Sequence, residues 1–264
     1  MNKVKVTLND ASITARGLRP IDDTFMQKLG EDLEFCQELL QVAMDNPHLK
    51  VISCSTQKAL HNIDTRSVTI DIKCEDEDGT IFAVEVQKAN DDDHQKRVRY
   101  NSSCVQIQSL EKGASFKELP DLYMIFITER DFLKKERVIY HIDRVIRETG
   151  EVISNGYQEI YINAQIDDGT DLAEYMKILK SETVCNNSKF PVICNLTNYY
   201  KNGKGSDNMC QAVEEYAKRY AKEQMYSVAE KFILIGNTDT EISDATGLSI
   251  EEVSDIRSNL QLSC

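Results

Sequence analysis

Two carboxylates and an amide lie on a stretch of the sequence that is typical of a β-hairpin. Residues 68–88 alternate apolar and polar side chains on either side of an acidic turn, which predicts two short strands. Glu85 and Gln87 are two residues apart on the second strand and share a face, while Asp71 lies on the first. Mg²⁺ prefers one or two carboxylates together with water and phosphate oxygens. The pattern is therefore a candidate divalent-metal site.

The length of the turn decides whether the two carboxylates meet. A three-residue loop, 77–79, with Gly79 in the left-handed conformation pairs Asp76 with Thr80 and places Asp71 opposite Glu85. A two-residue Asp-Gly loop puts Asp71 on the other face. Carboxylates about 4 Å apart repel by roughly 4 kcal/mol at an effective dielectric near 20, so a half-buried pair calls for a cation. A surface hairpin with solvated charges is the alternative.

The sequence around these residues resembles a known nuclease family. Asp71, thirteen intervening residues and Glu85-Val86-Gln87 are similar to the D-x(n)-E-x-Q variant of the PD-(D/E)xK signature. The stretches KRVRYNSSC and SLEKGASFKELPDLYMIFIT that follow resemble the PD-(D/E)xK family transposases, which are related to the recombination-promoting nucleases. The resemblance covers about residues 18–175.

This resemblance implies a restriction-endonuclease-like fold and Mg²⁺- or Mn²⁺-dependent hydrolysis of phosphodiester bonds in DNA. It also connects the protein with recombination or a mobile element. The residues that it implies are, as catalytic groups, Asp71, Glu85 and Gln87 and, as metal ligands, Asp71, Glu85, the carbonyl of Val86 and Asp23.

Some positions depart from the signature or stay open. Ile70 stands where the signature has Pro, and Gln87 stands where it has Lys. Gln is usual there in this family, but an amide cannot act as a cation toward the attacking water. A nuclease-fold protein that has lost catalysis and serves nucleic-acid binding or regulation is therefore the alternative. For the acid from the preceding helix, Asp23 is preferred over Glu31, and either one can instead cap the helix or lie in solvent.

A locally basic part follows the hairpin. Lys and Arg outnumber Asp and Glu between residues 96 and 147, and a helix is predicted for 94–110 with Val98, Val105, Cys104 and Ile107 inside. We assign Arg97, Arg99 and Tyr100 to nucleic-acid binding, because guanidinium groups suit phosphate oxygens and a tyrosine beside them can stack. Salt bridges from the two arginines to the acidic run at 91–93 are the alternative.

The remaining pattern predicts an α/β fold, a mixed sheet flanked by helices. A helix begins near Asp22 and ends before Pro47. Residues 122–128 form a continuous apolar run that is typical of a buried central strand. The other elements predicted are strands at 49–53, 138–142 and 159–163, a connector at 57–65 and a helix at 168–180.

The composition limits the class of protein. The net charge of −13 repels nucleic acids overall, so any phosphate contact must come from a local basic patch. The eight cysteines include no C-x-x-C pair and most have apolar neighbours, which favours buried thiols in a reducing compartment. No apolar run approaches the ~20 residues that span a bilayer. We expect a cytoplasmic protein without membrane contact.

The chain is predicted to have a nuclease-like domain at 1–180, a linker at 181–207 rich in Asn, Gly and Ser, and a helical tail at 208–264. The tail resembles a helix-turn-helix, with Gly247 in the turn and Ser249 and Glu252 as a capping box. Its second helix exposes acidic residues around a single Arg257, which suits DNA poorly. We expect a structural or homo-oligomer contact first, and a DNA-binding or transcription-regulator role second.

Overall fold

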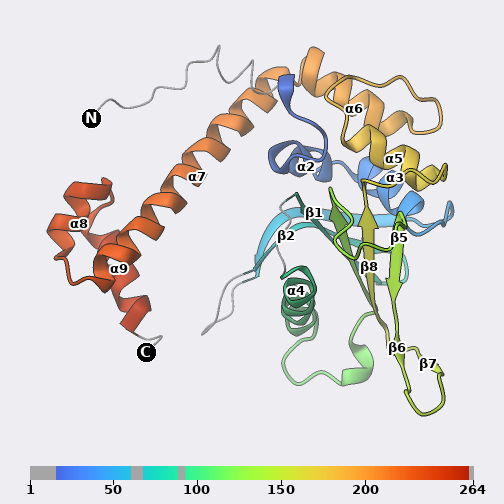
Figure 1. The fold of residues 1–264 in the computed structure, drawn as a ribbon, viewed down its shortest axis with the longest axis horizontal. Coiled ribbons are helices and arrows are strands. Elements are labelled where there is room, and N and C mark those ends of the chain that lie inside the picture. The colour runs from blue at the N-terminus through green and yellow to red at the C-terminus, as the bar shows by residue number, and fades with distance from the viewer. Residues whose placement is uncertain (1–15, 61–67, 89–92, 262–264) are drawn as a thin grey trace. The chain divides into compact units, whose positions relative to one another are not determined.

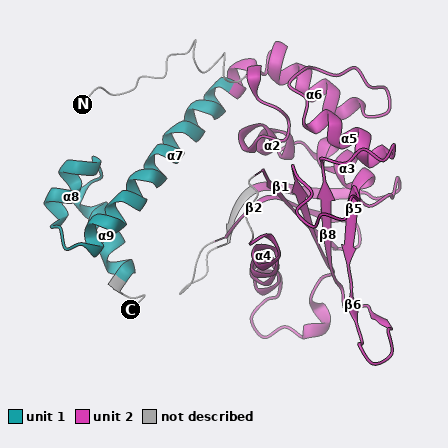
Figure 2. Ribbon diagram, viewed as in Figure 1, with its two compact units in different colours: residues 1–13, 210–264 teal, residues 14–209 magenta. Residues whose placement is uncertain are grey.

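The computed structural model describes residues 16–60, 68–88 and 93–261 of the chain. The chain divides into two compact units, and the larger one is formed by residues 14–209 (Figure 2). The described part of the smaller unit is formed by residues 210–261. Among the helices of the described residues, none is long and apolar enough to cross a membrane.

A mixed six-stranded sheet forms the centre of the larger unit (Figure 1). Its order is β1-β2-β3-β4-β8-β5; β3, β4 and β8 are parallel, and the other pairs are antiparallel. β6 and β7 form a separate two-stranded ribbon. The strands are β1 (Val51–Leu60), β2 (Val68–Asp76), β3 (Ile81–Gln87), β4 (Leu122–Thr128), β5 (Ile139–Ile142), β6 (Arg144–Val145), β7 (Val152–Ile153) and β8 (Tyr157–Asn163).

Helices cover this sheet, as the α/β prediction requires (Figure 1). Helix α4 packs on β1, β2 and β4, while α2 packs on β1 and β2 and α3 packs on β1. The helices of the larger unit are α2 (Asp23–Gly30), α3 (Leu33–Ala43), α4 (His94–Ser109), the short 3₁₀ helix η1 (Phe116–Glu118), α5 (Asp171–Leu179) and α6 (Pro191–Asn202). The prediction of a mixed sheet flanked by helices is confirmed.

The hairpin has the register that the three-residue loop predicts. Asp76 and Thr80 are joined by a hydrogen bond of 3.1 Å, and Gly79 has a φ of 80°. Ladder pairs such as Cys74 with Phe82 follow, which sets Asp71 opposite Glu85. The Asp76 carboxylate also accepts the N–H of Thr80 at 2.8 Å, so the side chain that opens the turn helps to fix its length.

The single helix predicted from Asp22 onward is wrong, because the chain breaks into α2 and α3. Gly30 is a poor helix residue and ends α2. Asp32 then caps α3 by accepting the N–H of Phe35 at 2.9 Å. The apolar residues keep helical spacing across the break, which is why the pattern alone suggests one helix.

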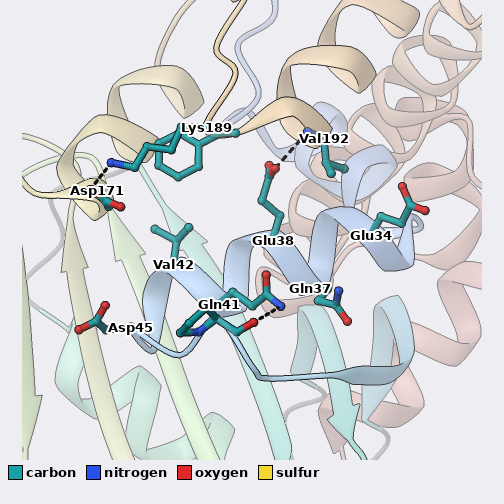
Figure 3. A pocket seen from close by; sticks show the side chains of 11 residues that line it. Glu34, Gln37, Glu38, Gln41, Val42, Asp45, Asp171, Lys189 and Val192 are labelled. Atoms are coloured by element: carbon teal, nitrogen blue, oxygen red, sulfur yellow. Dashed lines mark hydrogen bonds and ion pairs between the residues drawn. The ribbon is translucent and has the colours of Figure 1, made fainter.

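The segment 181–207 contains helix α6 where the sequence predicts a linker. Phe190, Ile193 and Cys194 are buried. The Glu38 carboxylate accepts the N–H of Val192 at 3.0 Å (Figure 3) and the N–H of Ile193 at 3.0 Å. A carboxylate at a helix N-terminus satisfies backbone donors that would otherwise lack partners. Part of the Asn, Gly and Ser content that indicated a loop flanks the helix at 186–188 and 203–205, and Asn195, Asn198 and Asn202 lie within it. The contact with Glu38 of α3 holds the N-terminus of the helix.

Three smaller expectations need correction. β1 continues to Leu60, so part of the connector predicted at 57–65 is strand; residues 61–65 lie outside the described residues. Ile107 is 66% exposed although it was expected inside, because it lies on the outer side of α4. Cys185 and Cys194 are disulfide-bonded, which the expectation of a reducing compartment did not include. Cys36, Cys74 and Cys104 are buried thiols as predicted.

Helices α7 (Ser206–Leu234), α8 (Asp239–Thr246) and α9 (Ile250–Gln261) form the tail. The turn and the cap have the local structure that the sequence predicts: Gly247 has a φ of 77°, and Ser249 and Glu252 exchange capping bonds of 2.9 and 3.1 Å. Val253 is fully buried in the tail's own core. The lone Arg257 is paired with Asp239 at 2.8 Å.

Candidate active site

The strands β2 and β3 separate at the two carboxylates. The last backbone pair that joins them is Ile72 with Val84, and Asp71 and Glu85 are the next residues along the two strands. Beyond that point β2 remains paired with β1, and β3 remains paired with β4. The N–H of Val86 donates to Oδ2 of Asp71 at 2.8 Å, so a side chain bridges the strands where the ladder ends.

Burial and like charge raise the pKa values of both carboxylates of the pair. Glu85 is only 8% exposed and Asp71 is half-buried. Burial raises the pKa of Glu85, the negative charge of Asp71 adds to the rise, and Arg97 and Asn101 oppose it. Burial also raises the pKa of Asp71, with Asp23 adding to the rise and the Val86 N–H and Arg97 opposing it. Both carboxylates would be stabilised as anions by a divalent cation.

Helix α4 contributes polar side chains that reach β3. Nη1 of Arg97 donates to Oε1 of Gln87 at 2.9 Å, and Nδ2 of Asn101 donates to Oε1 of Glu85 at 3.3 Å. Arg97 is also paired with Asp93 at 3.5 Å, so the salt-bridge alternative and the contact with the site both hold for this residue. Residues 91–92, the other predicted partners, lie outside the described residues.

A cavity of about 660 Å³ opens between α4 and the strands. Its lining includes Glu85, Arg97, Arg99, Tyr100 and Asn101. Arg99 is exposed, and Tyr100 is 38% exposed. All three residues that the sequence assigned to nucleic acid therefore line the same cavity as the buried carboxylate.

A network of charged groups holds the carboxyl ends of β3 and β4. Lys88 is paired with Asp22 at 3.1 Å and with Asp23 at 3.7 Å. Arg19 is paired with Asp22 at 3.0 Å and also with Glu129. Asp22 is the N-cap residue of α2 but makes no side-chain cap bond, because its carboxylate binds these two cations instead. The network places Asp23 near enough to Asp71 to raise the pKa of that carboxyl.

Sequence reasoning missed Asn101, Lys88 and Arg19. Asn101 lies four residues after Arg97 and thus on the same face of α4, a spacing that was visible in the sequence. Lys88 directly follows Gln87, but nothing in the sequence indicates its contact with Asp22. The second acid that was considered, Glu31, forms an ion pair with Lys28 at 3.0 Å at the end of α2. Asp64 lies outside the described residues.

The residues present fit a magnesium-type ion better than a zinc-type one. Among the residues that the structure describes, no three or more His, Cys, Asp or Glu side chains form a group that could hold a metal. The site instead offers two carboxylates with raised pKa values, one of which, Glu85, lines an open cavity. Mg²⁺ is held by one or two carboxylates and keeps several waters, so this donor set suits it.

Comparison with protein families gives one match. The model of the PD-(D/E)XK nuclease family transposases matches residues 30–234. The chain belongs to this family. For this PD-(D/E)XK protein, comparison with curated proteins and with solved structures finds no match. The matched range continues well past residue 175, so the resemblance that the sequence suggested was too short at its C-terminal end. α6 and all of α7 lie inside the matched range.

Proposed function

We propose that this protein is an endonuclease that hydrolyses phosphodiester bonds in DNA with Mg²⁺ or Mn²⁺, in recombination or on a mobile element. The observation that carries the proposal is the Asp71–Glu85 pair at the point where β2 and β3 separate, with Glu85 lining a cavity that Arg97 and Arg99 also line. The family contributes the nuclease class, and the site contributes the metal-binding residues.

Asp71 and Glu85 would hold the cation, with the carbonyl of Val86 as a further oxygen ligand. Within the described part of the chain, Asp23 does not join them in a group of three carboxylates. When bound, a divalent cation neutralises charge on the phosphodiester and lowers the pKa of water. Lys88 keeps Asp23 at this end of the sheet through its ion pair. Arg99 and Tyr100 would bind the DNA backbone along the cavity, where local positive charge offsets the acidic protein.

Gln87 would orient the attacking water. Its Oε1 accepts a hydrogen bond from Arg97, so the orientation of the amide is fixed and its NH₂ group is directed elsewhere as a donor. A donated hydrogen bond positions the water oxygen but supplies no positive charge. We therefore expect turnover that depends strongly on the metal.

The test is cleavage of supercoiled plasmid in Mg²⁺ or Mn²⁺, with EDTA as the blank. Asp71→Ala and Glu85→Ala should each lose more than about 100-fold in rate, since even partners of metal ligands cost 10–100-fold when mutated. Asp78→Ala is the matched control, because this carboxylate is exposed in the turn of the same hairpin and should leave the rate unchanged. Full activity in either site variant contradicts the assignment.

A folded wild type that cleaves no DNA in either metal would point to the other interpretation, a nuclease fold used for nucleic-acid binding or regulation. Mn²⁺ titration separates the two outcomes further. A site that has lost its function should bind Mn²⁺ no better than the Asp71→Ala variant does.

A further inference from the structure

Two side chains on α4 form hydrogen bonds with two side chains on β3, and the distance between the two along the helix matches the distance between their partners along the strand. Arg97 and Asn101 are four residues apart on the helix, and their partners Gln87 and Glu85 are two residues apart on the strand. Four helical residues rise roughly 6 Å and two strand residues roughly 6.6 Å, so one face of the helix is in register with one face of the strand. The pairing is therefore repeated along the contact and is not a single chance approach.

We propose that α4 completes the active site: Arg97 supplies the positive charge that Gln87 cannot supply, and Asn101 is a positioning residue that holds the Glu85 carboxylate. This inference rests on the proposed nuclease function. It adds a role for Asn101, and it changes the role of Arg97 from one phosphate contact among several to the cation beside the reacting phosphate.

The surroundings of Arg97 support that role. Its side chain is 33% exposed and is held between Gln87 and Asp93, while it lines the cavity above Glu85. Its charge also opposes the rise in pKa of both Asp71 and Glu85, so the guanidinium acts on both carboxylates at once. A lysine at position 87 would place an ammonium group on the same face of β3, beside the same carboxylate.

The surroundings of Asn101 support a positioning role. Asn101 is 7% exposed, so its amide is fixed by packing, and it donates to one oxygen of Glu85. Because an amide is neutral, it holds the carboxylate without neutralising it and leaves its charge to attract a cation.

The test of Arg97 separates rate from binding. Arg97→Ala should lower kcat by about 10²–10³-fold, the cost of removing one preorganised group that stabilises transition-state charge. The Kd of a DNA duplex in EDTA should change much less. Adding Gln87→Lys to Arg97→Ala should restore part of the lost kcat, because the ammonium returns a cation to the same strand face. Gln95→Ala, an exposed neighbour on α4, is the control.

Two results overturn the role of Arg97. One is an unchanged kcat in Arg97→Ala with a weakened duplex Kd, which would make it a phosphate contact only. The other is a double variant that recovers nothing although circular dichroism shows it to be folded.

The test of Asn101 uses metal affinity, measured by calorimetric titration of Mn²⁺ without DNA. Asn101→Ala should weaken Mn²⁺ binding by about 10–100-fold, the usual cost of removing a partner of a metal ligand. If the alanine variant does not fold, Asn101→Leu keeps the branched shape of the side chain and removes the donor together with the amide oxygen. Unchanged Mn²⁺ affinity in a folded variant overturns the positioning role.

The cleavage measurement and the Mn²⁺ titration also distinguish a failure of this inference from a failure of the proposed function. A wild type that binds Mn²⁺ but cleaves no DNA refutes the nuclease proposal and the role of Arg97, while the Mn²⁺ affinity of Asn101→Ala still decides the role of Asn101. A wild type that binds no Mn²⁺ overturns both proposals. An active wild type with unaffected Arg97 and Asn101 variants overturns the inference alone.

Discussion

At the scale of single residues, the site holds two carboxylates, Asp71 and Glu85, near each other and largely shielded from solvent. Glu85 is 8% exposed and lies opposite Asp71 across the end of the ladder. Such a pair opposes folding unless a cation is bound, because burial and mutual repulsion both disfavour the charged forms. The protein tolerates this cost since Val86 and Asn101 each donate a hydrogen bond to the pair.

The first prediction follows from that cost. In EDTA at pH 8, Glu85→Gln should raise the thermal midpoint by a few degrees, about 2–4 °C for each kcal/mol gained in a domain of this size. The amide removes a buried charge and keeps an oxygen that can accept from Asn101. Glu75→Gln, at an exposed carboxylate on β2, should change nothing.

Adding Mn²⁺ should reverse the order of the thermal midpoints, so that the wild type becomes more stable than Glu85→Gln. Ligand binding to the folded state stabilises only the protein that retains the site. The wild type should therefore gain in midpoint and Glu85→Gln should not. A Glu85→Gln variant less stable than wild type in EDTA would show that the pair is not under electrostatic strain.

At the scale of elements, α2 packs closely on β1 and β2, and β2 is the first strand of the hairpin. Gly30, the last residue of α2, allows this approach: a Cβ there would lie 2.7 Å from Cγ1 of Ile72 and 2.8 Å from Cγ2 of Thr56. Both neighbours are β-branched residues on strands and have little rotamer freedom to move away. Ile72 is adjacent to Asp71, so this packing also locates the site.

The second prediction is that Gly30→Ala destabilises the protein. Helix propensity alone would favour alanine by up to about 1 kcal/mol, but overpacking a filled core costs about 1–3 kcal/mol, so the net effect should be a loss. Urea unfolding measures it. Gly17→Ala is the control, because a Cβ at Gly17 has no atom within 4 Å. A variant as stable as Gly17→Ala would mean that the contact between α2 and the sheet relaxes freely.

At the scale of the whole molecule, charge and domain organisation limit where DNA can bind. The net charge of −13 makes the average surface repulsive, and the tail offers little to offset it. Its second helix exposes Glu251 and Asp255, and Arg257 is already paired with Asp239. The cavity beside α4 is therefore the surface that we expect DNA to contact.

The third prediction follows for a truncated chain. A protein that ends at residue 216 keeps the larger unit together with the first turns of α7 and should retain both cleavage and duplex affinity. Fluorescence anisotropy and plasmid cleavage measure the two properties. A loss of duplex affinity of about tenfold or more, 1.4 kcal/mol, would restore the tail as a DNA-binding module.

The sequence by itself determined the local features of this protein. Alternation in residues 68–88 and the Asp78-Gly79 turn give the hairpin, while the choice between its two registers came from the structure. The apolar run at 122–128 gives the central strand. The capping box at Ser249 is local as well. These features depend on neighbours a few residues apart, so the residues that specify them are contiguous in the chain.

Only the tertiary structure decided how α4 meets β3 and how α3 holds α6. The contacts of Asn101 with Glu85 and of Glu38 with Val192 join residues 16 and 154 positions apart. Such contacts depend on the packing of whole elements, and sequence spacing carries little information about it. The Asn- and Gly-rich stretch after residue 181 therefore suggested a linker, although long-range contacts hold a helix there.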